Sequence, residues 1–496
     1  MVPTAAGPLA RPSSSPSESR QLAIARARSH FDSGAFEREL APRIAVPSVS
    51  QGADRAPEQA AALRHYLEAE LTPALVALGF DCSVHLNPVP GGGPLLVARR
   101  IEDPNRPTVL MYGHGDVIRG MDPSWRHGAG PWTLAREGDR LHGRGTADNK
   151  GQHSLNLAAL AAVLAERGGR LDFNAIWLFE TSEETGSPGL HAFARARRDL
   201  LAADLFLASD GPRLHADAPT LFMGSRGTVN FTLECRARDS GHHSGNWGGV
   251  LKNPGLRLAH AIASLVDARG AIRVPALRPP AIPPAVRAAL GEVRVGGDAG
   301  DPATDADWGE PGLSQAERLF AWNTLEPLAY VCGQPDNPVN AIPPWARATM
   351  HMRFVVGTDV GDGRDNGAAL ARHLRQHLDG EGFADIVIEV GPVMAATRLD
   401  PEHPWVRFCA ASIATTTGRA PVVLPNLGGS LPNDVFADIL GLPTVWVPHS
   451  HPGCAQHAPD EHLMLAAVRE GLAMMAGLYW DLGSLERSQL DTLSRT

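Results

Sequence analysis

Seven acidic or imidazole side chains stand in short polar loops, most of them at the end of an apolar run. The loops are GHGD after TVLMY, GRGTADNKG, ETSEETGS after NAIWLFE, SDG after LFLA, and GCAQHAPDE. They carry His114 and Asp116, Asp148, Glu183 and Glu184, Asp210, and His457. Imidazole nitrogens and carboxylate oxygens bind divalent metal ions and transfer protons, so this set could perform metal-assisted hydrolysis.

Each of these residues alone has an ordinary structural explanation. Asp148 precedes a predicted helix, where aspartate is a common N-cap, and Asp210 stands before Gly-Pro, as in many turns. Together they are unusual, because the loops at the strand ends of one sheet converge and clustered carboxylates repel one another. A bound dication removes that repulsion. Two histidines and three carboxylates suit zinc, and one shared carboxylate would bridge two ions about 3.5–4 Å apart.

The segments between these loops alternate strand and helix patterns. Residues 174–180 are predicted as a buried strand, residues 205–208 as another short strand, and residues 154–166 as a helix. This alternation predicts an α/β fold with a mostly parallel sheet, which binds ligands at the carboxyl ends of its strands.

A change of pattern after residue 213 predicts a second domain. Residues 274–311 are Pro-rich and predicted to lie on the surface, and the helix–strand alternation returns at residues 366–378 and 386–390. We therefore predict a disordered tail (1–20), a discontinuous α/β domain (21–214 and 358–496), and an inserted α+β domain (215–357).

Composition narrows the class of protein. The chain has 496 residues, 43% of them apolar, and a formal net charge of −9. Without a basic run to neutralise phosphates, nucleic acid is not expected as a partner. No apolar run reaches the length of about 18 residues that a membrane span needs. The five cysteines are scattered and odd in number, which predicts a reducing compartment, the cytoplasm.

The ordered segments GHGDV, GRGTADNKG, EETGS, SDG and QHAPDE resemble those of the M20 family of metallopeptidases. This family includes cytosolic dipeptidases, carnosinases, aminoacylases and acetylornithine deacetylase. The resemblance covers most of the chain after Arg20, and the segment HHSGNWGGVLKNP resembles the family's lid-domain signature. It implies that the discontinuous domain (21–214 and 358–496) is a zinc-peptidase-like, metal-binding catalytic domain and that the inserted domain (215–357) is a lid or dimerisation domain. Patterns of other enzyme classes, such as G-x-S-x-G, Walker A and H-E-x-x-H, do not occur.

The resemblance implies a role for each residue. Asp148 would bridge two divalent ions (zinc, with manganese or cobalt as alternatives), His114 and Asp210 would complete one shell, and Glu184 and His457 the other. Asp116 would orient His114. Glu183 would be the general base that takes a proton from metal-bound water, whose pKa the ions lower toward about 7, and passes it to the leaving amine.

Further residues resemble the family's substrate-binding positions. His243 resembles the lid histidine that reaches the partner subunit's active site in dimeric members, so a homodimer is expected; its neighbour His242 is the alternative. Arg353 resembles an arginine that grips a substrate carboxylate through a bidentate contact. Asn340, Gly429 and Ser430 resemble further substrate contacts.

We therefore predict a binuclear metallohydrolase that cleaves dipeptides or similar small amides. Asp at position 210 favours the dipeptidase members, whereas the deacylases more often carry Glu there; an N-acyl-amino-acid deacylase or amidase is the alternative. A catalytically silent ligand-binding protein is a remote alternative, because such a protein would have lost the base or a ligand. The sequence does not specify the side chains of the substrate.

Overall fold

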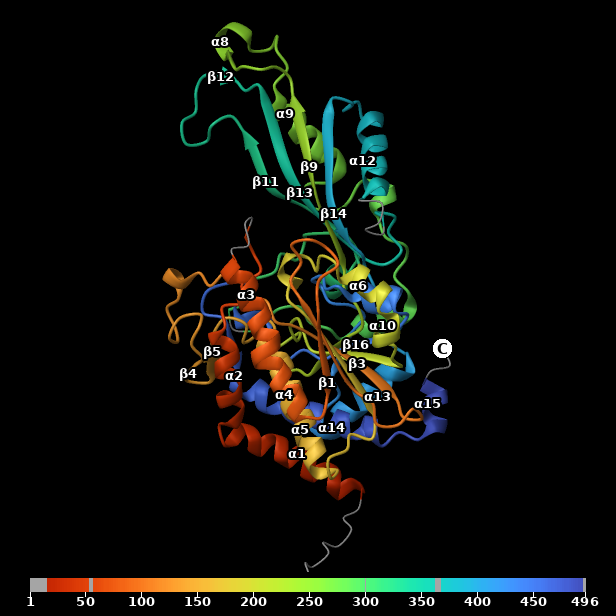
Figure 1. Ribbon diagram of the computed structural model, residues 1–496. Helices are drawn as coiled ribbons and strands as arrows, with labels where there is room; N and C mark the ends of the chain where they lie inside the picture. The colour runs from red at the N-terminus through yellow and green to blue at the C-terminus, as the bar shows by residue number, and fades with distance from the viewer. Residues whose placement is uncertain (1–15, 53–56, 299, 362–366, 494–496) are drawn as a thin grey trace, which may run out of the picture.

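The computed structural model describes residues 16–52, 57–298, 300–361 and 367–493. It has two bodies: a large body built on an eight-stranded sheet and, above it in Figure 1, a small body built on a four-stranded sheet. None of the helices in the described ranges combines the length and the apolar character that crossing a membrane requires.

The sheet of the large body is mixed, with a parallel centre. In spatial order its strands are β1 (Asp81–His85), β2 (Leu95–Arg100), β6 (Asn174–Glu180), β3 (Thr108–His114), β7 (Leu205–Ala208), β16 (Thr444–Trp446), β8 (Thr220–Phe222) and β15 (Val422–Leu424). Strands β6, β3, β7 and β16 run parallel, whereas β1 and β2 are antiparallel additions at one edge. The predicted α/β class with a mostly parallel sheet is confirmed.

Helices cover both faces of this sheet, which explains why its central strands are apolar at nearly every position. One face packs against α1 (Pro16–Asp32), α2 (Ala35–Ala45), α5 (Lys150–Glu166), α13 (Pro404–Thr417) and α14 (Leu465–Gly483). The other packs against α6 (Leu190–Ala196), α10 (Pro284–Leu290), α11 (Gln315–Phe320) and η5 (Val435–Ile439). Successive residues of β3 alternate between the two cores: Val109 and Met111 face the first, Leu110 and Tyr112 the second.

The small body is an antiparallel sheet with helices on one face. Its strands, in spatial order, are β11 (Thr324–Cys332), β13 (Trp345–Phe354), β9 (Gly227–Arg236) and β14 (Ile386–Met394), and its helices are α9 (Pro254–Leu265) and α12 (Ala368–Gly380). Apolar residues of these elements form a third core. At the tip of this body lie β10 (His242–His243), α8 (Ser244–Trp247) and β12 (Ala341–Ile342) (Figure 1).

The remaining elements are short. They are α3 (Pro57–His65), η1 (Tyr66–Leu71), α4 (Thr72–Ala77), η2 (Asp122–Ser124), η3 (Glu183–Thr185), α7 (Arg198–Leu201), η4 (Pro275–Leu277), η6 (Pro452–Cys454) and α15 (Arg487–Leu493). A separate three-stranded sheet joins β4 (Ala135–Glu137), β5 (Arg140–His142) and β17 (His462–Met464).

The predicted end of the inserted domain at residue 357 is wrong, because two elements after it belong to the small body. β14 pairs with β9, and α12 packs in the small body's core, so this body continues to Met394. The error has a simple cause: a helix–strand pattern identifies the elements but does not specify which sheet they join. The predicted helix at 366–378 runs from Ala368 to Gly380, and residue 366 lies outside the described residues.

The predicted surface stretch at 274–311 is also partly wrong. Ile282, Val286 and Leu290 are buried in the core of the large body beside strand residues such as Phe206. The apolar face of α10 causes this, since its buried residues recur four apart. The segment around α10 and α11 therefore belongs to the large body, although residues before and after it belong to the small one.

The prediction of a disordered tail at residues 1–20 is wrong for its last five residues. Residues 1–15 lie outside the described residues, but residues 16–20 form the first turns of α1. Arg20 is buried there and donates two hydrogen bonds of 2.8 Å to the carboxylate of Asp481. This buried ion pair fixes the start of α1 against α14.

Candidate functional site

The parallel strands of the large body bring the predicted polar loops to one edge of its sheet. His114 is the last residue of β3, the Glu183–Glu184 turn follows β6, and Asp210 follows β7. Because β3 lies between β6 and β7 and runs parallel to both, all three loops leave the sheet at the same edge. Two other loops, carrying Asp148 and His457, complete the cluster.

His114, Asp148 and Asp210 form the first ligand group. One side-chain atom of each lies within 4.8 Å of the others. Nε2 of His114 is 2.9 Å from Oδ1 of Asp148 and 3.5 Å from Oδ2 of Asp210. The Oδ2 atom of Asp210 is buried and accepts no hydrogen bond from any described residue. A metal ion at this position would supply the partner that this oxygen lacks.

Asp148, Glu184 and His457 form the second ligand group. Nε2 of His457 is 3.2 Å from Oδ2 of Asp148 and 3.0 Å from Oε2 of Glu184. Asp148 therefore presents one oxygen to each group, as a bridging carboxylate must. His457 adopts a φ of 58°, in the left-handed region that a residue with a side chain occupies only at a cost.

Asp116 is buried and contacts both His114 and the turn that carries Glu183 and Glu184. Its backbone carbonyl accepts the Nδ1–H of His114 at 2.9 Å, and its Oδ1 lies 3.6 Å from the same nitrogen. This contact leaves Nε2 of His114 directed at the ligand group. The two carboxylate oxygens accept the backbone N–H groups of Glu183 and Glu184, each at 3.1 Å.

The cluster concentrates negative charge. Burial raises the pKa of Glu184 and of Asp210 to about 7, and raises the pKa of Glu183 well above its ordinary value. Burial would also raise the pKa of Asp148, but hydrogen bonds with His114 and His457 hold it well below its usual range. The described part of the chain contains no lysine or arginine ion pair with these four carboxylates. The donors present fit two divalent cations, which would neutralise this charge.

Glu461 is a residue that the sequence reasoning missed. It is fully buried, pairs with Nη1 of Arg144 at 2.7 Å, and accepts backbone N–H groups of Gly145, Ala147 and Asp148 at 2.9–3.1 Å. It therefore fixes the loop that presents Asp148. Its place in QHAPDE, four residues after His457, was the available signal.

Three of the predicted substrate-binding residues lie together. Nη1 of Arg353 donates to Oγ of Ser430 at 2.8 Å, and both Arg353 and Gly429 line a cavity of about 440 Å³ that also includes Pro212, two residues after Asp210. Arg226, which the sequence reasoning missed, lines the same cavity. Burial, and then the charge of Arg353, lower the pKa of Arg226 to about 9. The two guanidinium groups make this cavity suitable for an anion.

The other two predicted contacts lie elsewhere. His243 pairs across β10 and β12 with Ala341, and the carbonyl of Asn340 accepts the N–H of Ser244 at 2.8 Å. This places His243 and Asn340 at the tip of the small body, the end remote from the eight-stranded sheet (Figure 1). Neither ligand group contains them. Within one chain the structure does not bring them to the cluster.

Comparison with known proteins gives consistent results. Residues 110–481 match Peptidase family M20/M25/M40. Beta-Ala-His dipeptidase of Homo sapiens is 34% identical over 422 residues, which cover 80% of this chain and 78% of the relative. The mouse enzyme of the same name (Mus musculus) is 36% identical, but its match spans 38% of its length. The crystal structure of human carnosine dipeptidase 1 shares the fold, with a TM-score of 0.71 at 22% identity over 94% of this chain and 99% of that one.

Proposed function

The chain belongs to peptidase family M20, and from this premise we propose that it is a binuclear metallohydrolase that cleaves dipeptides or similar small amides. The observation that supports this proposal most directly is the position of Asp148. Its two carboxylate oxygens face different imidazoles, His114 and His457, and each imidazole has a further carboxylate within 3.5 Å.

His114, Asp148 and Asp210 would hold one ion, and Asp148, Glu184 and His457 the other. When bound, the ions supply Lewis acidity: they lower the pKa of water and polarise the scissile carbonyl. We assign zinc as the metal, with manganese and cobalt as alternatives, because imidazole and carboxylate ligands accept all three.

Glu183 serves as the general base. It is the neighbour of Glu184 in the same short turn but belongs to neither ligand group, so its carboxylate is available for protons. Without metal ions, burial raises the pKa of Glu183 well above the ordinary value. A carboxylate with a raised pKa is suited to carry protons near neutral pH. Glu183 takes a proton from the attacking water and delivers it to the leaving amine. Asp116 orients this turn through the two backbone N–H groups described above.

Arg353, with Gly429 and Ser430, binds the carboxylate of the substrate. The arginine is partly buried, and its Nη1 is already oriented by Ser430. A positioned guanidinium recognises a carboxylate by two parallel hydrogen bonds. This contact places the amide of a short substrate near the cluster and favours dipeptides over amides without a carboxylate.

The small body acts as a lid and dimerisation domain. Its edge strand β11 exposes Leu328, Tyr330 and Val331, and the adjoining loop exposes Val339, an apolar set suited to burial against a second copy. In a homodimer the tip would carry His243 and Asn340 to the partner's cluster, where an imidazole can stabilise the oxyanion of the reaction. The described cysteines are all free, which supports a reducing, cytoplasmic location.

The test is a substrate panel, run after metal analysis of the purified protein. Dipeptides, N-acetyl amino acids and longer N-acyl amino acids are offered to the protein reconstituted with Zn²⁺, Mn²⁺ or Co²⁺. We expect about two metal ions per chain and hydrolysis of dipeptides. Hydrolysis of acyl amino acids alone would replace the dipeptidase assignment by the deacylase alternative, and metal binding without any turnover would favour the silent binding protein.

A further inference from the structure

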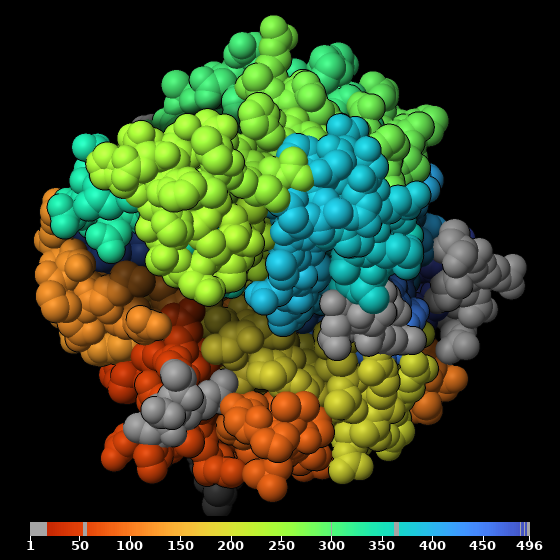
Figure 2. Space-filling model, turned by 90° about the horizontal axis from the view of Figure 1, so that it is seen from above, coloured from red at the N-terminus to blue at the C-terminus, as the bar shows by residue number. Residues whose placement is uncertain are grey.

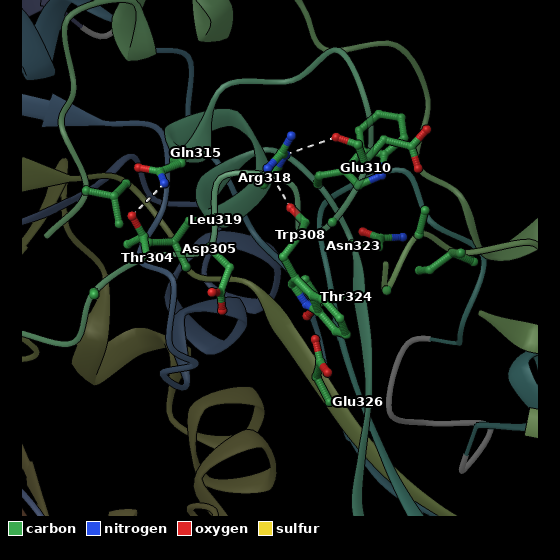
Figure 3. A pocket seen from close by; sticks show the side chains of 17 residues that line it. Thr304, Asp305, Trp308, Glu310, Gln315, Arg318, Leu319, Asn323, Thr324 and Glu326 are labelled. Atoms are coloured by element: carbon green, nitrogen blue, oxygen red, sulfur yellow. Dashed lines mark hydrogen bonds between the residues drawn. The ribbon is translucent and has the colours of Figure 1, made fainter. Parts of the chain in front are cut away.

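A cavity of about 290 Å³ lies where the two bodies meet, and none of its lining residues belongs to either ligand group (Figure 3). The small body contributes residues 270–272 and the start of β11, including Glu326. The opposite wall comes from residues 303–319, part of the segment that packs on the large body. A ligand held here would contact both bodies at once.

Trp308 forms an aromatic wall of this cavity. Trp308 is 49% exposed, but one part of its indole packs directly against Gly270. A side chain at position 270 would not fit, because its Cβ atom would lie 2.9 Å from the ring. Gly270 has a φ of 80°, which also favours glycine, and the N–H of Gly309 donates to the carbonyl of Arg269. The loop therefore holds a large exposed aromatic side chain in a fixed position, where a ligand could cover it.

The charges around the cavity are unbalanced. Asp305, Glu310 and Glu326 all line it, and only Glu310 has an ion pair, with Arg278. Neither Asp305 nor Glu326 has a side-chain hydrogen bond or ion pair with another described residue. Glu326 is partly buried, and burial raises its pKa, while the charge of Arg226 acts on it in the opposite direction without forming an ion pair. Two carboxylates beside an indole thus have no cation from the described ranges in direct contact.

The one cation of the lining does not supply this counter-charge. Arg318 donates to the backbone carbonyls of Glu310, Ala306 and Trp308, so its guanidinium is committed to holding the loop (Figure 3). In Figure 3 the side chains of Asp305, Trp308 and Glu326 lie below Arg318 in the view, and of these three residues only Trp308, through its backbone carbonyl, accepts one of these bonds.

We propose that this cavity binds a small organic ammonium group carried on an apolar or aromatic stem. The cation would lie against the face of Trp308, which attracts positive charge, and between the carboxylates of Asp305 and Glu326. The stem would contact Ile272 and Leu319. The volume is at the lower end for a small-molecule pocket and suits a single side chain or a simple amine.

The ammonium can come from two sources. This cavity shares Val295, Thr304 and Leu319 with the 440 Å³ cavity that contains Arg353, so the side chain of a bound dipeptide is one source. That source rests on the proposed function. The other source is a free amine that binds in this cavity beside the active site. Its binding does not depend on hydrolysis of a substrate.

The first experiment measures binding directly, by calorimetric titration of the metal-loaded protein with phenethylamine. Its neutral isostere 2-phenylethanol should bind at least about tenfold more weakly. Glu326→Gln and Trp308→Ala should each weaken phenethylamine binding about tenfold, while Trp308→Phe, which keeps a ring, should lose less. Glu389→Gln, the same charge change at an exposed site of β14, should leave the affinity unchanged.

Equal binding of the alcohol and the amine, or unchanged affinity in Glu326→Gln and Trp308→Ala, would overturn the proposal. Absence of saturable phenethylamine binding would overturn it as well. These results are independent of catalysis, so a failure of the proposed function would not be mistaken for a failure of this inference.

The second experiment separates the two sources by comparing Ala-Lys with Ala-Leu as substrates. If the substrate supplies the ammonium, Glu326→Gln raises KM for Ala-Lys about tenfold and leaves KM for Ala-Leu and both kcat values unchanged. If a free amine is the ligand, phenethylamine changes the turnover of both dipeptides equally, and this effect is lost in Glu326→Gln.

Discussion

The carboxylate of Asp116 accepts the backbone N–H of Glu183 at 3.1 Å, so the residue in contact with His114 also holds the turn that carries the proposed general base. The second oxygen holds Glu184 in the same way. One buried residue thus sets the relative position of the proposed ligand His114 on β3 and two glutamates after β6.

Asp116→Asn should disturb both sides of this arrangement. The amide NH2 of asparagine would face a backbone N–H that now donates to a carboxylate, and the negative charge near His114 would be lost. We expect kcat/KM to fall about 10–100-fold. Asp103→Asn is the matched control, because Asp103 accepts the N–H of Asn105 in an exposed loop. Unchanged kcat/KM in Asp116→Asn would contradict the positioning role.

Glu183→Gln and Glu184→Gln should differ although the residues are neighbours. Glu183→Gln removes the base and should lower kcat about 10²–10⁴-fold while both metal ions are retained. Glu184→Gln weakens a ligand and should lower the metal content. Elemental analysis beside steady-state kinetics distinguishes them, and equal metal loss in both variants would show that the two roles are wrongly assigned.

The free energy of unfolding of the metal-free protein should fall as the pH rises from 6 to 9. The pKa values of Glu184 and Asp210 are raised to about 7 in the folded state, so these two groups bind more protons in the folded protein than in the unfolded chain, and their contribution to stability is lost as the protons leave. His457, with its pKa raised to about 11 by Asp148 and Glu184, acts in the same direction, because its contribution is complete below the unfolded pKa and decreases above it. The buried Lys150, whose pKa is lowered to about 7, acts in the opposite direction as a single group.

The metal-loaded protein should respond differently, because metal ions bind the deprotonated ligands. The difference in melting temperature between loaded and chelator-treated protein should therefore widen with pH. Asp210→Asn removes one raised group and should flatten the pH dependence of the metal-free protein. A metal-free protein that is more stable at pH 8.5 than at pH 6 would contradict this account.

Glu461→Gln should weaken metal binding through the Asp148 loop. The substitution disturbs four backbone hydrogen bonds and leaves the buried Arg144 without its charge partner, so stability falls too. We expect metal affinity to fall about 10–100-fold. Glu470→Gln separates the two effects, since Glu470 pairs with the buried Arg213 and neither residue belongs to a ligand group. It should lower stability and leave metal affinity unchanged.

His243→Ala should be inactive alone but complemented by Glu183→Ala if His243 acts across a dimer. A mixed dimer would contain one site with both an intact base and an intact partner histidine. Mixing the two variants in equal amounts should restore about a quarter of the wild-type activity. Light scattering should show a dimer throughout; a strict monomer, or no recovery after subunit exchange, would exclude the trans role.

The sequence alone determined the large elements and the chemistry of the cluster. Buried strands such as β6 consist of apolar residues at every position except their ends, and His114, Asp148 and Glu184 follow or join such elements in loops with distinctive composition. These signals are local, since side-chain type and periodicity decide which face of a strand or helix is buried.

Only the tertiary structure decided how the pieces combine. β14 and α12 look like any helix–strand pair, but long-range pairing with β9 assigns them to the small body. Glu461 and Arg226 act through contacts with residues hundreds of positions away, such as Gly145 and Gly428. The place of Glu461 in QHAPDE marks it as a candidate, but no local pattern identifies the partners of either residue. The same holds for the cavity around Trp308, whose walls join two bodies: segments far apart in the chain meet only when both are folded.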